Sequence, residues 1–492
     1  MLSIQTLEMI APGLFRRNRP ALAGVLLLCA VVGWPSSRAQ DLGWPQFRGP
    51  DGRGISKTAN PPVVFNQTTN LAWKMTIPRG VSSPIVVEDK VFITGLGEGN
   101  ELQTLCLNRY SGKILWQRSI KVEKLEPSHS LSSPASATPV SDGKRVYVYF
   151  GSLGLIAYAL DGSEIWTKQL PQPVVEFGSS ASPILADGKL IFLCDQDLGS
   201  YLLALDPSTG NELWRVKRDE FPRGFGSPFY WKEKGEIIAP GTLWLVAYSP
   251  ASGQELWRVH CQARVVCTTP AAEGDLLFAA SWTTGGDATS RLTMPSFKEF
   301  TAEHDTNRDG LITKKEMPAG PLLERYAQID FDKNQSVTEE EWTRMAAIFA
   351  RVENSCVAIR RQGAQGVPTI EWKITKGLPY VPSPLAYERR LWLVKNGGIV
   401  SCLDAVSGKA FFMEERLGAQ GDYHASPVAA AGRVYFVSQQ GVITVVRSSD
   451  QLEILARNDL QDSVLATPAL AENRILIRGA KTLYCFGLPE KL

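Results

Sequence analysis

The sequence predicts a mainly β protein, an eight-bladed β-propeller of four-stranded blades that carries a small α-helical insertion. Two observations support this prediction: a segment that recurs along the chain, and one interval between copies that is far too long. Each copy begins with Ser-Pro or Thr-Pro, continues into apolar strand residues and a Gly-containing turn, and in most cases reaches a large side chain. Most copies are spaced by roughly the forty residues that a four-stranded blade requires. The copies begin at Ser83-Pro84, Thr138-Pro139, Ser182-Pro183, Ser227-Pro228, Thr269-Pro270, Ser383-Pro384, Ser426-Pro427 and Thr467-Pro468.

The clearest blade spans residues 177–218. Pro183 stands where an inner strand begins, a position at which the missing N–H donor is tolerated. Asp187-Gly188 predicts a hairpin turn between the first two strands. Further on, Gly210 provides the positive φ of a second turn, and Trp214 lies on the outer strand, where its ring can cover the neighbouring blade.

The step from a small residue to a large one recurs in other copies. It runs from Cys106 to Trp116, from Ala247 to Trp257 and from Cys402 to Phe412, with a degenerate copy from Val445 to Leu455 and a shorter one from Ala159 to Trp166. A two-sheet sandwich is the alternative fold, but sandwiches do not repeat this register. The pattern therefore favours the propeller, with eight blades predicted and seven as the alternative.

The two ends of the repeat region are complementary. Residues 70–77, with Trp73, resemble an outer strand without inner strands before it, whereas residues 467–486 provide inner strands without a Trp. We expect these ends to complete one blade together, because ring closure removes an exposed strand edge. The blades are then predicted to occupy 70–292 and 353–492.

The long interval contains two segments typical of calcium-binding loops. In the first, 305–316, oxygen-bearing side chains occupy positions 1, 3 and 5, a Gly occupies position 6, and a Glu occupies position 12. The second, 330–341, keeps this pattern but has Gln335 in place of Gly. The predicted Ca²⁺ ligands are Asp305, Asn307, Asp309, Leu311, Thr313 and Glu316 in the first loop, and Asp330, Asp332, Asn334, Ser336, Thr338 and Glu341 in the second.

We expect the second site to be the weaker, because a non-Gly residue at positive φ costs about 1 kcal/mol. Apolar residues at helical spacing flank both loops, so residues 293–352 resemble a paired EF-hand inserted in the fifth blade. Ile312 is expected to pair with its counterpart in the second loop. Calcium is abundant outside cells, so a structural role is favoured over a sensor role.

The first 39 residues are typical of a secretory signal peptide. Arg16, Arg17 and Arg19 precede an apolar run over 21–32, and Ser37-Arg38-Ala39 predicts cleavage after Ala39. The run is too short for a membrane anchor, which needs about 20 residues. Twin-arginine export is the alternative route, and Asn18-Arg19-Pro20 after the arginine pair disfavours it. We expect a periplasmic or extracellular protein, with a lead-in segment over 40–69.

Charge and cysteine content narrow the function classes. The predicted signal peptide holds four Arg and one Glu, so 48 basic and 49 acidic side chains remain of the chain's 52 and 50. This balance favours neither nucleic acid nor anionic lipid as a partner, and no later apolar run predicts a transmembrane anchor. Seven cysteines remain, an odd number that argues against a complete disulfide framework. Cys261 and Cys267 are the one pair close enough in sequence to form a bridge.

The motif Ala-x-Asp-x-x-Thr-Gly-x-x-x-Trp at 204–214 resembles the tryptophan-docking motif of the pyrroloquinoline quinone (PQQ)-like propeller repeats. That family includes quinoprotein alcohol dehydrogenases and the propeller lipoprotein of outer-membrane β-barrel assembly. The resemblance covers about 70–290 and 353–488. The segment Trp44-Pro45-Gln46-Phe47-Arg48-Gly49-Pro50 is similar to the lead-in of secreted bacterial members. The resemblance implies the fold, and function does not follow from it.

In the dehydrogenases of this family, a quinone lies on the propeller axis with a calcium ion at the hub, an Asp base and often a disulfide between adjacent cysteines. This chain has no adjacent cysteines, and its recognisable calcium ligands lie in the insertion. We therefore expect no quinone cofactor and favour a binding role over an enzymatic one. The residues that precede the inner strands, and so surround one mouth of the channel, include the candidate ligand contacts Arg79, His129, Arg264, Tyr380, Tyr423 and His424.

The leading hypothesis is an exported calcium-binding propeller that acts as a binding or scaffold protein for a protein, peptide or glycan partner. The competing hypothesis is a PQQ- and calcium-dependent dehydrogenase. Calcium-gated recognition is a third possibility, because the predicted EF-hand pair lies between strands of one blade.

Overall fold

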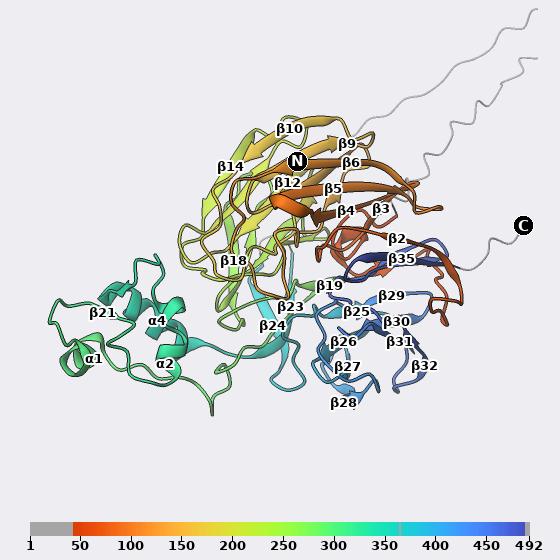
Figure 1. The fold of residues 1–492 in the computed structure, drawn as a ribbon. Coiled ribbons are helices and arrows are strands. Elements are labelled where there is room, and N and C mark those ends of the chain that lie inside the picture. Colours follow the sequence, from red (N-terminus) through yellow and green to blue (C-terminus); the bar gives the residue numbers. More distant parts are fainter. Residues whose placement is uncertain (1–42, 364–365, 488–492) are drawn as a thin grey trace, which may run out of the picture. The chain divides into compact units, whose positions relative to one another are not determined.

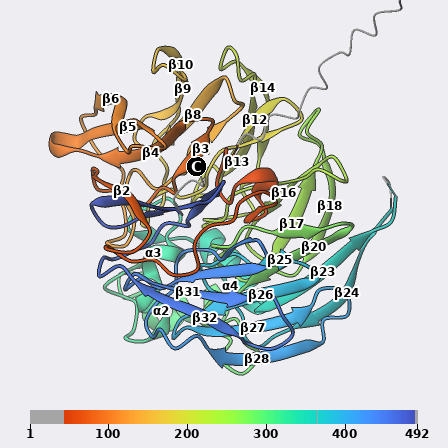
Figure 2. The ribbon, with the colours of Figure 1, turned by 90° about the vertical axis from the view of Figure 1, so that its right-hand side faces the viewer.

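The computed structural model describes residues 43–363 and 366–487. The predicted signal peptide and the first residues of the predicted lead-in segment lie outside the described residues. In the described part, eight successive sheets form the blades of a propeller, which confirms the predicted fold class and blade number (Figures 1 and 2).

The first four blades contain consecutive strands, ordered from the inner to the outer one. They are β3 (Ile85–Val87), β4 (Lys90–Leu96), β5 (Glu101–Asn108) and β6 (Ile114–Lys121); β7 (Val140–Ser141), β8 (Arg145–Phe150), β9 (Gly154–Ala159) and β10 (Glu164–Gln169); β11 (Ile184–Ala186), β12 (Lys189–Cys194), β13 (Tyr201–Leu205) and β14 (Glu212–Lys217); and β15 (Phe229–Trp231), β16 (Glu236–Pro240), β17 (Trp244–Tyr248) and β18 (Glu255–His260).

The other four blades include one interrupted blade and one that joins the two ends of the repeat region. They are β19 (Ala271–Glu273), β20 (Leu276–Ser281), β23 (Ser355–Arg361) and β24 (Pro368–Ile374); β25 (Leu385–Tyr387), β26 (Arg390–Lys395), β27 (Ile399–Asp404) and β28 (Ala410–Arg416); β29 (Val428–Ala430), β30 (Arg433–Val437), β31 (Val442–Arg447) and β32 (Ile454–Asp459); and β33 (Ala469–Ala471), β34 (Arg474–Arg478), β35 (Thr482–Gly487) and β2 (Leu71–Thr76).

The small-to-large step of the sequence corresponds to direct cross-strand pairing. Ala204 lies opposite Trp214 in the third blade, and the same pairing joins Cys106 to Trp116, Ala247 to Trp257, Ala358 to Trp372, Cys402 to Phe412 and Cys485 to Trp73. A small side chain is needed because the indole ring turns across its strand toward the next blade.

In two blades the residues that lie opposite each other differ from the two ends of the sequence step. In the second blade Trp166 lies opposite Ala157, and in the seventh blade Val445 pairs with Ala456. A register shift interrupts the pairing of the two outer strands at the corresponding point in all eight blades.

The tryptophan rings dock on glycines of the neighbouring blade. The Nε1 of Trp166 donates to the carbonyl oxygen of Pro207 at 3.0 Å, and its ring lies so close to Gly210 that a Cβ there would be 2.7 Å from it. The same contact joins Trp116 to Gly162, Trp214 to Gly253, Trp372 to Gly408 and Trp73 to Gly112. Glycine therefore meets two requirements at this turn: it adopts the positive φ, and its missing Cβ lets an indole ring approach closely.

The ring closes as predicted, because β2 pairs antiparallel with β35 in the eighth blade. Trp73 of this blade then docks on Gly112 of the first blade, so that the interlocking contact passes across the junction of the two ends. Buried aliphatic and aromatic side chains fill the space between neighbouring blades. Closure therefore buries faces of the first and last blades that would otherwise be exposed.

The lead-in segment crosses the inner ends of several blades, which the sequence did not indicate. Trp44 forms a β-bridge with Val86, the short 3₁₀ helix η1 (Pro50–Gly52) follows, and β1 (Ile55–Ser56) pairs in parallel with the inner strand β29. The fully buried Arg48 donates to the carbonyl oxygens of Pro270 at 3.1 Å and Pro384 at 2.5 Å. These contacts attach the segment to the fifth, sixth and seventh blades.

Residues 282–354 form the helical insert, which separates β20 from β23 in the fifth blade. It contains α1 (Phe297–His304), β21 (Ile312–Thr313), α2 (Pro321–Glu324), α3 (Tyr326–Ile329), β22 (Ser336–Val337) and α4 (Glu339–Arg351). Ile312 pairs with Val337 between β21 and β22, as expected. The tilted rings of Phe300 and Trp342 pack with centroids 4.2 Å apart in an apolar core that also includes Leu243 of the propeller. A second short 3₁₀ helix, η2 (Glu98–Asn100), lies outside the insert.

The seven cysteines of the described residues are free thiols. Cys106, Cys402 and Cys485 occupy the small position opposite a large ring, as their sequence context indicated. Among the described residues, no helix has the length and apolar character needed to cross a membrane.

Candidate functional site

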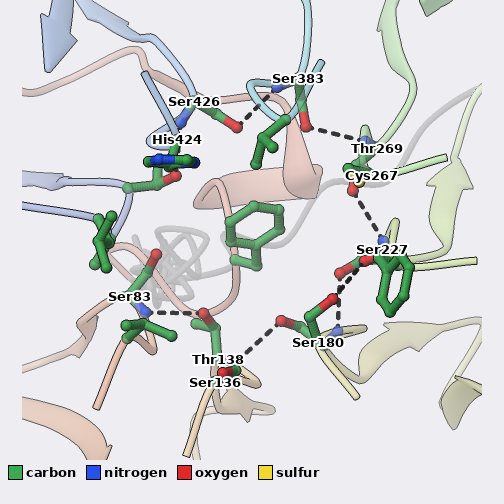
Figure 3. Close-up of a pocket in the computed structure, with 18 of the residues that line it drawn as sticks. Ser83, Ser136, Thr138, Ser180, Ser227, Cys267, Thr269, Ser383, His424 and Ser426 are labelled. Atoms are coloured by element: carbon green, nitrogen blue, oxygen red, sulfur yellow. Dashed lines mark hydrogen bonds between the residues drawn. The ribbon is translucent and has the colours of Figure 1, made fainter. Parts of the chain in front are cut away.

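The Ser or Thr that begins each repeat lies at the centre of the propeller, where the eight residues form a ring of hydroxyl groups (Figure 3). The backbone N–H of each residue from Ser83 to Ser426 donates to the side-chain oxygen of the next one around the ring. Thr138, for example, donates to Ser182 at 3.0 Å, and Ser182 donates to Ser227 at 2.8 Å. Seven such bonds join Ser83, Thr138, Ser182, Ser227, Thr269, Ser383, Ser426 and Thr467.

The hydroxyl ring surrounds a cavity of about 200 Å³. Phe47 of the lead-in segment also lines this cavity, together with Leu131, Phe225, Val381 and His424. The His424 Nε2 lies 3.0 Å from the Oε1 of Gln439, so its imidazole is held at the rim by a neighbour on the same blade. The channel is therefore a short funnel lined by alcohol and apolar groups.

The six residues predicted to surround the mouth lie in different environments. His424 lines the funnel, whereas Arg79 and His129 line a second cavity of about 310 Å³ between the first, second and eighth blades. Tyr380 lines a third cavity, and Arg264 and Tyr423 are buried. The Tyr423 hydroxyl donates to the carbonyl oxygen of Ala419 within the apolar core between the sixth and seventh blades.

The second cavity contains a buried cation. Arg478 is fully buried, and burial lowers its pKa from 12.5 to about 9. Its guanidinium donates to the Oγ of Ser82 at 2.6 Å and to the carbonyl oxygens of Thr94 at 2.8 Å and Pro78 at 3.1 Å. These bonds join the eighth blade to the first, so the arginine also reinforces the ring where its two ends meet.

The clearest metal-binding geometry lies in the helical insert. Carboxylate oxygens of Asp330, Asp332 and Glu341 lie within 4.8 Å of one another, and this group could hold a metal ion. The Asp330 side chain is almost completely buried, and its Oδ1 makes no hydrogen bond. Burial raises the pKa of Asp330, and the neighbouring Glu341 adds to this effect. A cation would supply the partner that the buried oxygen lacks.

The rest of the 330–341 loop supports this arrangement. Glu341 accepts the backbone N–H of Phe331 at 2.8 Å and that of Thr338 at 2.9 Å, which fixes its two oxygens between the two ends of the loop. Gln335 has the positive φ, 73°, of the position usually occupied by Gly, and its N–H donates to Asp330. The residues therefore fit a hard cation that takes oxygen ligands.

The 305–316 loop has similar internal bonds but a more open set of carboxylates. Glu316 accepts from the backbone and side chain of Thr313, and these bonds lower its pKa to about 2. Asp305 accepts the N–H groups of Arg308 and Gly310. Among the described residues, the second loop is the one place where three carboxylates converge closely enough to hold a metal ion.

The insert is held against the propeller next to its second loop. Lys333, the fourth residue of that loop, lies with its Nζ 2.6 Å from the carboxylate of Asp197, which is fully buried between β12 and β13. Arg223 pairs with the same carboxylate at 2.7 Å and donates to the carbonyl oxygen of Ala327. Arg264 contributes a further bond, donating to the Oε1 of Gln328 at 2.5 Å.

Sequence analysis missed the hydroxyl ring, Arg48, Asp197 and Arg478. A signal for the ring was present, because all eight repeat starts carry Ser or Thr before Pro. The partners of Arg48 and Arg478 are backbone oxygens hundreds of residues away along the chain, which no local pattern identifies.

With this geometry the protein belongs to the class of eight-bladed β-propellers with interlocking tryptophans. Residues 62–227 and 199–294 match a protein family whose description is outer membrane protein assembly factor BamB. Residues 62–294 of the propeller thus match the PQQ-like/BamB repeat family.

One curated relative is the quinohemoprotein alcohol dehydrogenase ADH IIB of Pseudomonas putida. It is 26% identical over 157 residues, which make up 30% of this chain and 22% of that relative. The match therefore spans less than a quarter of that enzyme's length.

Solved structures share the fold at low sequence identity. BamB from Moraxella catarrhalis has a TM-score of 0.52 at 12% identity, covering 86% of this chain and 99% of its own. The quinohemoprotein alcohol dehydrogenase from Comamonas testosteroni has a TM-score of 0.55 at 13% identity, covering 93% and 83%. A europium-containing methanol dehydrogenase gives 0.56 at 11%, covering 92% and 99%. At these identities the likeness concerns the fold alone.

Taken by itself, the funnel is small for a large cofactor such as PQQ, although it adjoins the second cavity through Val81, Leu131, Ser132, Leu465 and Ala466. Its volume of about 200 Å³ is below the roughly 300–1,000 Å³ of typical small-molecule sites. Phe47 of the lead-in segment occupies part of its wall, and none of the described residues that line it is an Arg or Lys. Seven of the eight hydroxyl oxygens of the ring already accept a hydrogen bond from the backbone N–H of the preceding blade.

Proposed function

We propose that the protein is an exported, calcium-binding PQQ-like propeller that acts as a binding or scaffold protein for a protein, peptide or glycan partner. The observation that carries the proposal is the lead-in segment in the channel. Arg48 and Phe47 lie at the inner ends of the blades, so the space in which a redox cofactor would sit is reduced to the hydroxyl-lined funnel. The loops at the mouth and the helical insert provide the surface for recognition.

We further propose that the helical insert is a paired EF-hand with two Ca²⁺ ions. The support is the convergence of Asp330, Asp332 and Glu341, the unpartnered Asp330 oxygen, and the pairing of Ile312 with Val337. The ion pair of Lys333 with Asp197 places the second loop against the third blade, which supports either a structural role or control of recognition by calcium. The abundance of extracellular calcium favours the structural role.

The proposed location follows from the sequence of residues 1–39, which has the features of a cleaved signal peptide. The protein would then work in the periplasm or outside the cell. Expression of the full chain, followed by fractionation and N-terminal sequencing, tests this proposal: a mature N-terminus at Gln40 in the exported fraction is the expected result.

The alternative function is a PQQ- and calcium-dependent dehydrogenase, which the 26% identity to the alcohol dehydrogenase of Pseudomonas putida supports over 157 residues. Equilibrium dialysis of the mature protein against PQQ with Ca²⁺, followed by a dye-reduction assay with alcohols, separates the two functions. We expect neither stoichiometric quinone binding nor turnover. Tight quinone binding together with turnover would replace the binding function by the enzymatic one.

A further inference from the structure

A third cavity, larger than the funnel and the second cavity at about 390 Å³, lies between the fifth and sixth blades at the base of the helical insert. One wall is the start of the insert, with Trp282 directly after β20 and Asp287. The connection from β24 to β25 provides Lys376 and Tyr380. The remaining lining residues are Thr375, Gly377, Leu378, Lys395, Asn396 and Glu414.

Two aromatic rings stand at right angles in this cavity. The ring centroids of Trp282 and Tyr380 are 5.9 Å apart with an interplanar angle of 82°, so each ring leaves a face that the other does not cover. Tyr380 is 41% exposed, an unusual exposure for a large aromatic side chain packed against another ring. Its pKa is raised to about 12 by the neighbouring Cys267 and by burial, so its hydroxyl stays protonated and can both donate and accept.

The polar lining mixes donors with acceptors and has balanced charge. Lys395 forms an ion pair with Glu414, and Asp287 accepts from the Nδ2 of Asn354 at 3.0 Å. Lys376, which also lines the cavity, is exposed. Two lysines and two carboxylates therefore border the cavity without a strong net charge.

The wall formed by the insert is held in place by Asn354. Its Oδ1 accepts the N–H of Thr283 at 2.9 Å, and its Nδ2 donates to the Thr283 carbonyl oxygen at 3.0 Å as well as to Asp287. Asn354 is itself buried, and a Cβ at Gly286 would lie only 2.2 Å from its side-chain oxygen. The start and the end of the insert are thus fastened together, which preorganises the cavity before any ligand arrives.

A ligand for this cavity must present apolar patches to the rings and closely spaced hydroxyl groups to the lysine, carboxylate and amide side chains. A simple ion would leave the two rings without a partner, and a hydrocarbon would leave the polar groups unpaired. A pyranose ring has both features, because its C–H faces pack on aromatic rings while its hydroxyls donate and accept. The volume falls within the roughly 300–1,000 Å³ typical of small-molecule sites.

We infer that the cavity bordered by Trp282 and Tyr380 is a binding site for a neutral saccharide. This inference rests on the proposed binding function and narrows its partner to a glycan, held at the junction of the fifth and sixth blades. The ring faces take the apolar side of a sugar unit, and Lys376, Asp287 and Asn396 bind its hydroxyl groups. The insert contributes one wall, so a sugar bound in this cavity touches both the propeller and the insert.

The test uses the mature chain, residues 40–492, with Ca²⁺ present. Binding of cello-, xylo-, manno- and N-acetylchito-hexaose is measured by isothermal titration calorimetry and by the change in tryptophan fluorescence. We expect at least one of these probes to bind, and both Trp282→Ala and Tyr380→Ala to weaken that binding by about tenfold or more. Tyr110→Ala is the matched control, because Tyr110 is 44% exposed on the first blade, and it should leave the affinity unchanged.

Circular dichroism and the urea midpoint of each variant show that it is folded, and Lys376→Ala provides a second change at an exposed position of the same cavity. Absence of binding to all four probes at concentrations of about 10 mM would overturn the inference. The inference would also be overturned if the Tyr380→Ala variant bound the saccharide with the same affinity as the Tyr110→Ala variant. In both cases the wider binding function still stands, because it fails only through the quinone dialysis and turnover assay.

Discussion

Lys333 of the insert and Asp197 of the third blade form an ion pair of 2.6 Å across the junction of the helical insert and the propeller. Asp197 is completely buried and is shared with Arg223, whose guanidinium is also almost fully buried. Lys333 lies between Asp332 and Asn334 in the proposed second calcium loop. A change in the conformation of this loop therefore changes the surroundings of a charge that belongs to the propeller.

The two partners of this pair should differ in their effect on stability. Lys333→Met removes a partly exposed charge and should lower the free energy of unfolding by about 1 kcal/mol or less. Asp197→Asn removes the buried counter-ion of Arg223, which keeps only the partly exposed Glu176, and should cost about 3 kcal/mol. Urea unfolding measures both, with Lys189→Met as the control at an exposed pair. Equal effects of all three substitutions would show that the junction is not held by Asp197.

Calcium binding should have a stoichiometry of two. Calorimetric titration of the calcium-depleted protein is expected to show two sites, and Glu316→Gln and Glu341→Gln should each remove one of them, weakening it by at least about tenfold. Trp342, packed on Phe300 in the insert core, provides a fluorescence signal for the same titration. Glu339→Gln, on the exposed start of α4, is the control. Two intact sites in both loop variants would contradict the EF-hand proposal.

Gly210 and Gly188 form a matched pair for the docking of Trp166. Both have φ of +71°, but a Cβ at Gly210 would lie 2.7 Å from the Trp166 ring, whereas a Cβ at Gly188 would meet nothing within 4 Å. Gly188→Ala should cost about 1 kcal/mol of unfolding free energy from backbone strain alone. Gly210→Ala should cost a further 1–3 kcal/mol or so, because the indole must move. If denaturant unfolding gives the same loss for both, the ring contact does not contribute to stability.

Glu126 should make stability depend on pH. Burial raises its pKa from 4.5 to about 7, with Ser179 donating to the carboxyl at 3.1 Å. Between these two pH values the unfolded chain releases the proton while the folded protein keeps it, so the stability due to this group is present below about pH 4.5 and is lost as the pH rises to about 7. The loss is about 3 kcal/mol at most, at about 1.4 kcal/mol for each pKa unit.

Glu126→Gln removes this titration, so the variant should gain stability relative to the wild type as the pH is raised from 5 to 8. Urea unfolding at the two pH values measures the difference, and Glu123→Gln, at an exposed position nearby, should follow the wild type. A constant difference between the wild type and Glu126→Gln would show that the carboxyl is ionised in the folded protein throughout this range.

The fold was predictable because its main interaction is periodic. Gly210 and Trp214 lie four residues apart, and most repeats carry a Gly and a large ring at this spacing, so the register is visible without long-range information. The second and seventh blades depart from the common step: the second has the shorter Asp161-Gly162 turn, and the seventh has no large ring at this position. There the spacing alone does not identify the observed pairs, Ala157 with Trp166 and Val445 with Ala456.

The sites were less predictable, because they depend on how loops from distant segments meet. Tyr423 and His424 are adjacent in sequence, yet His424 lines the funnel and Tyr423 points into the core. Tyr380 was identified as a mouth residue, but its ring partner Trp282 lies almost a hundred residues earlier, beyond the insert. The calcium loops could be proposed from sequence because all their expected ligands lie within one short segment.

The hydrogen bonds from backbone N–H groups to the hydroxyl ring have a mechanical consequence for the channel. Each of the seven bonds fixes the spacing between adjacent inner strands, and the bonds follow one another around the axis. A ligand that widened the channel would have to lengthen several of these hydrogen bonds at once. Molecules that reach the centre must therefore fit the channel at its existing width, and conformational change is left to the side chains and loops around its mouth.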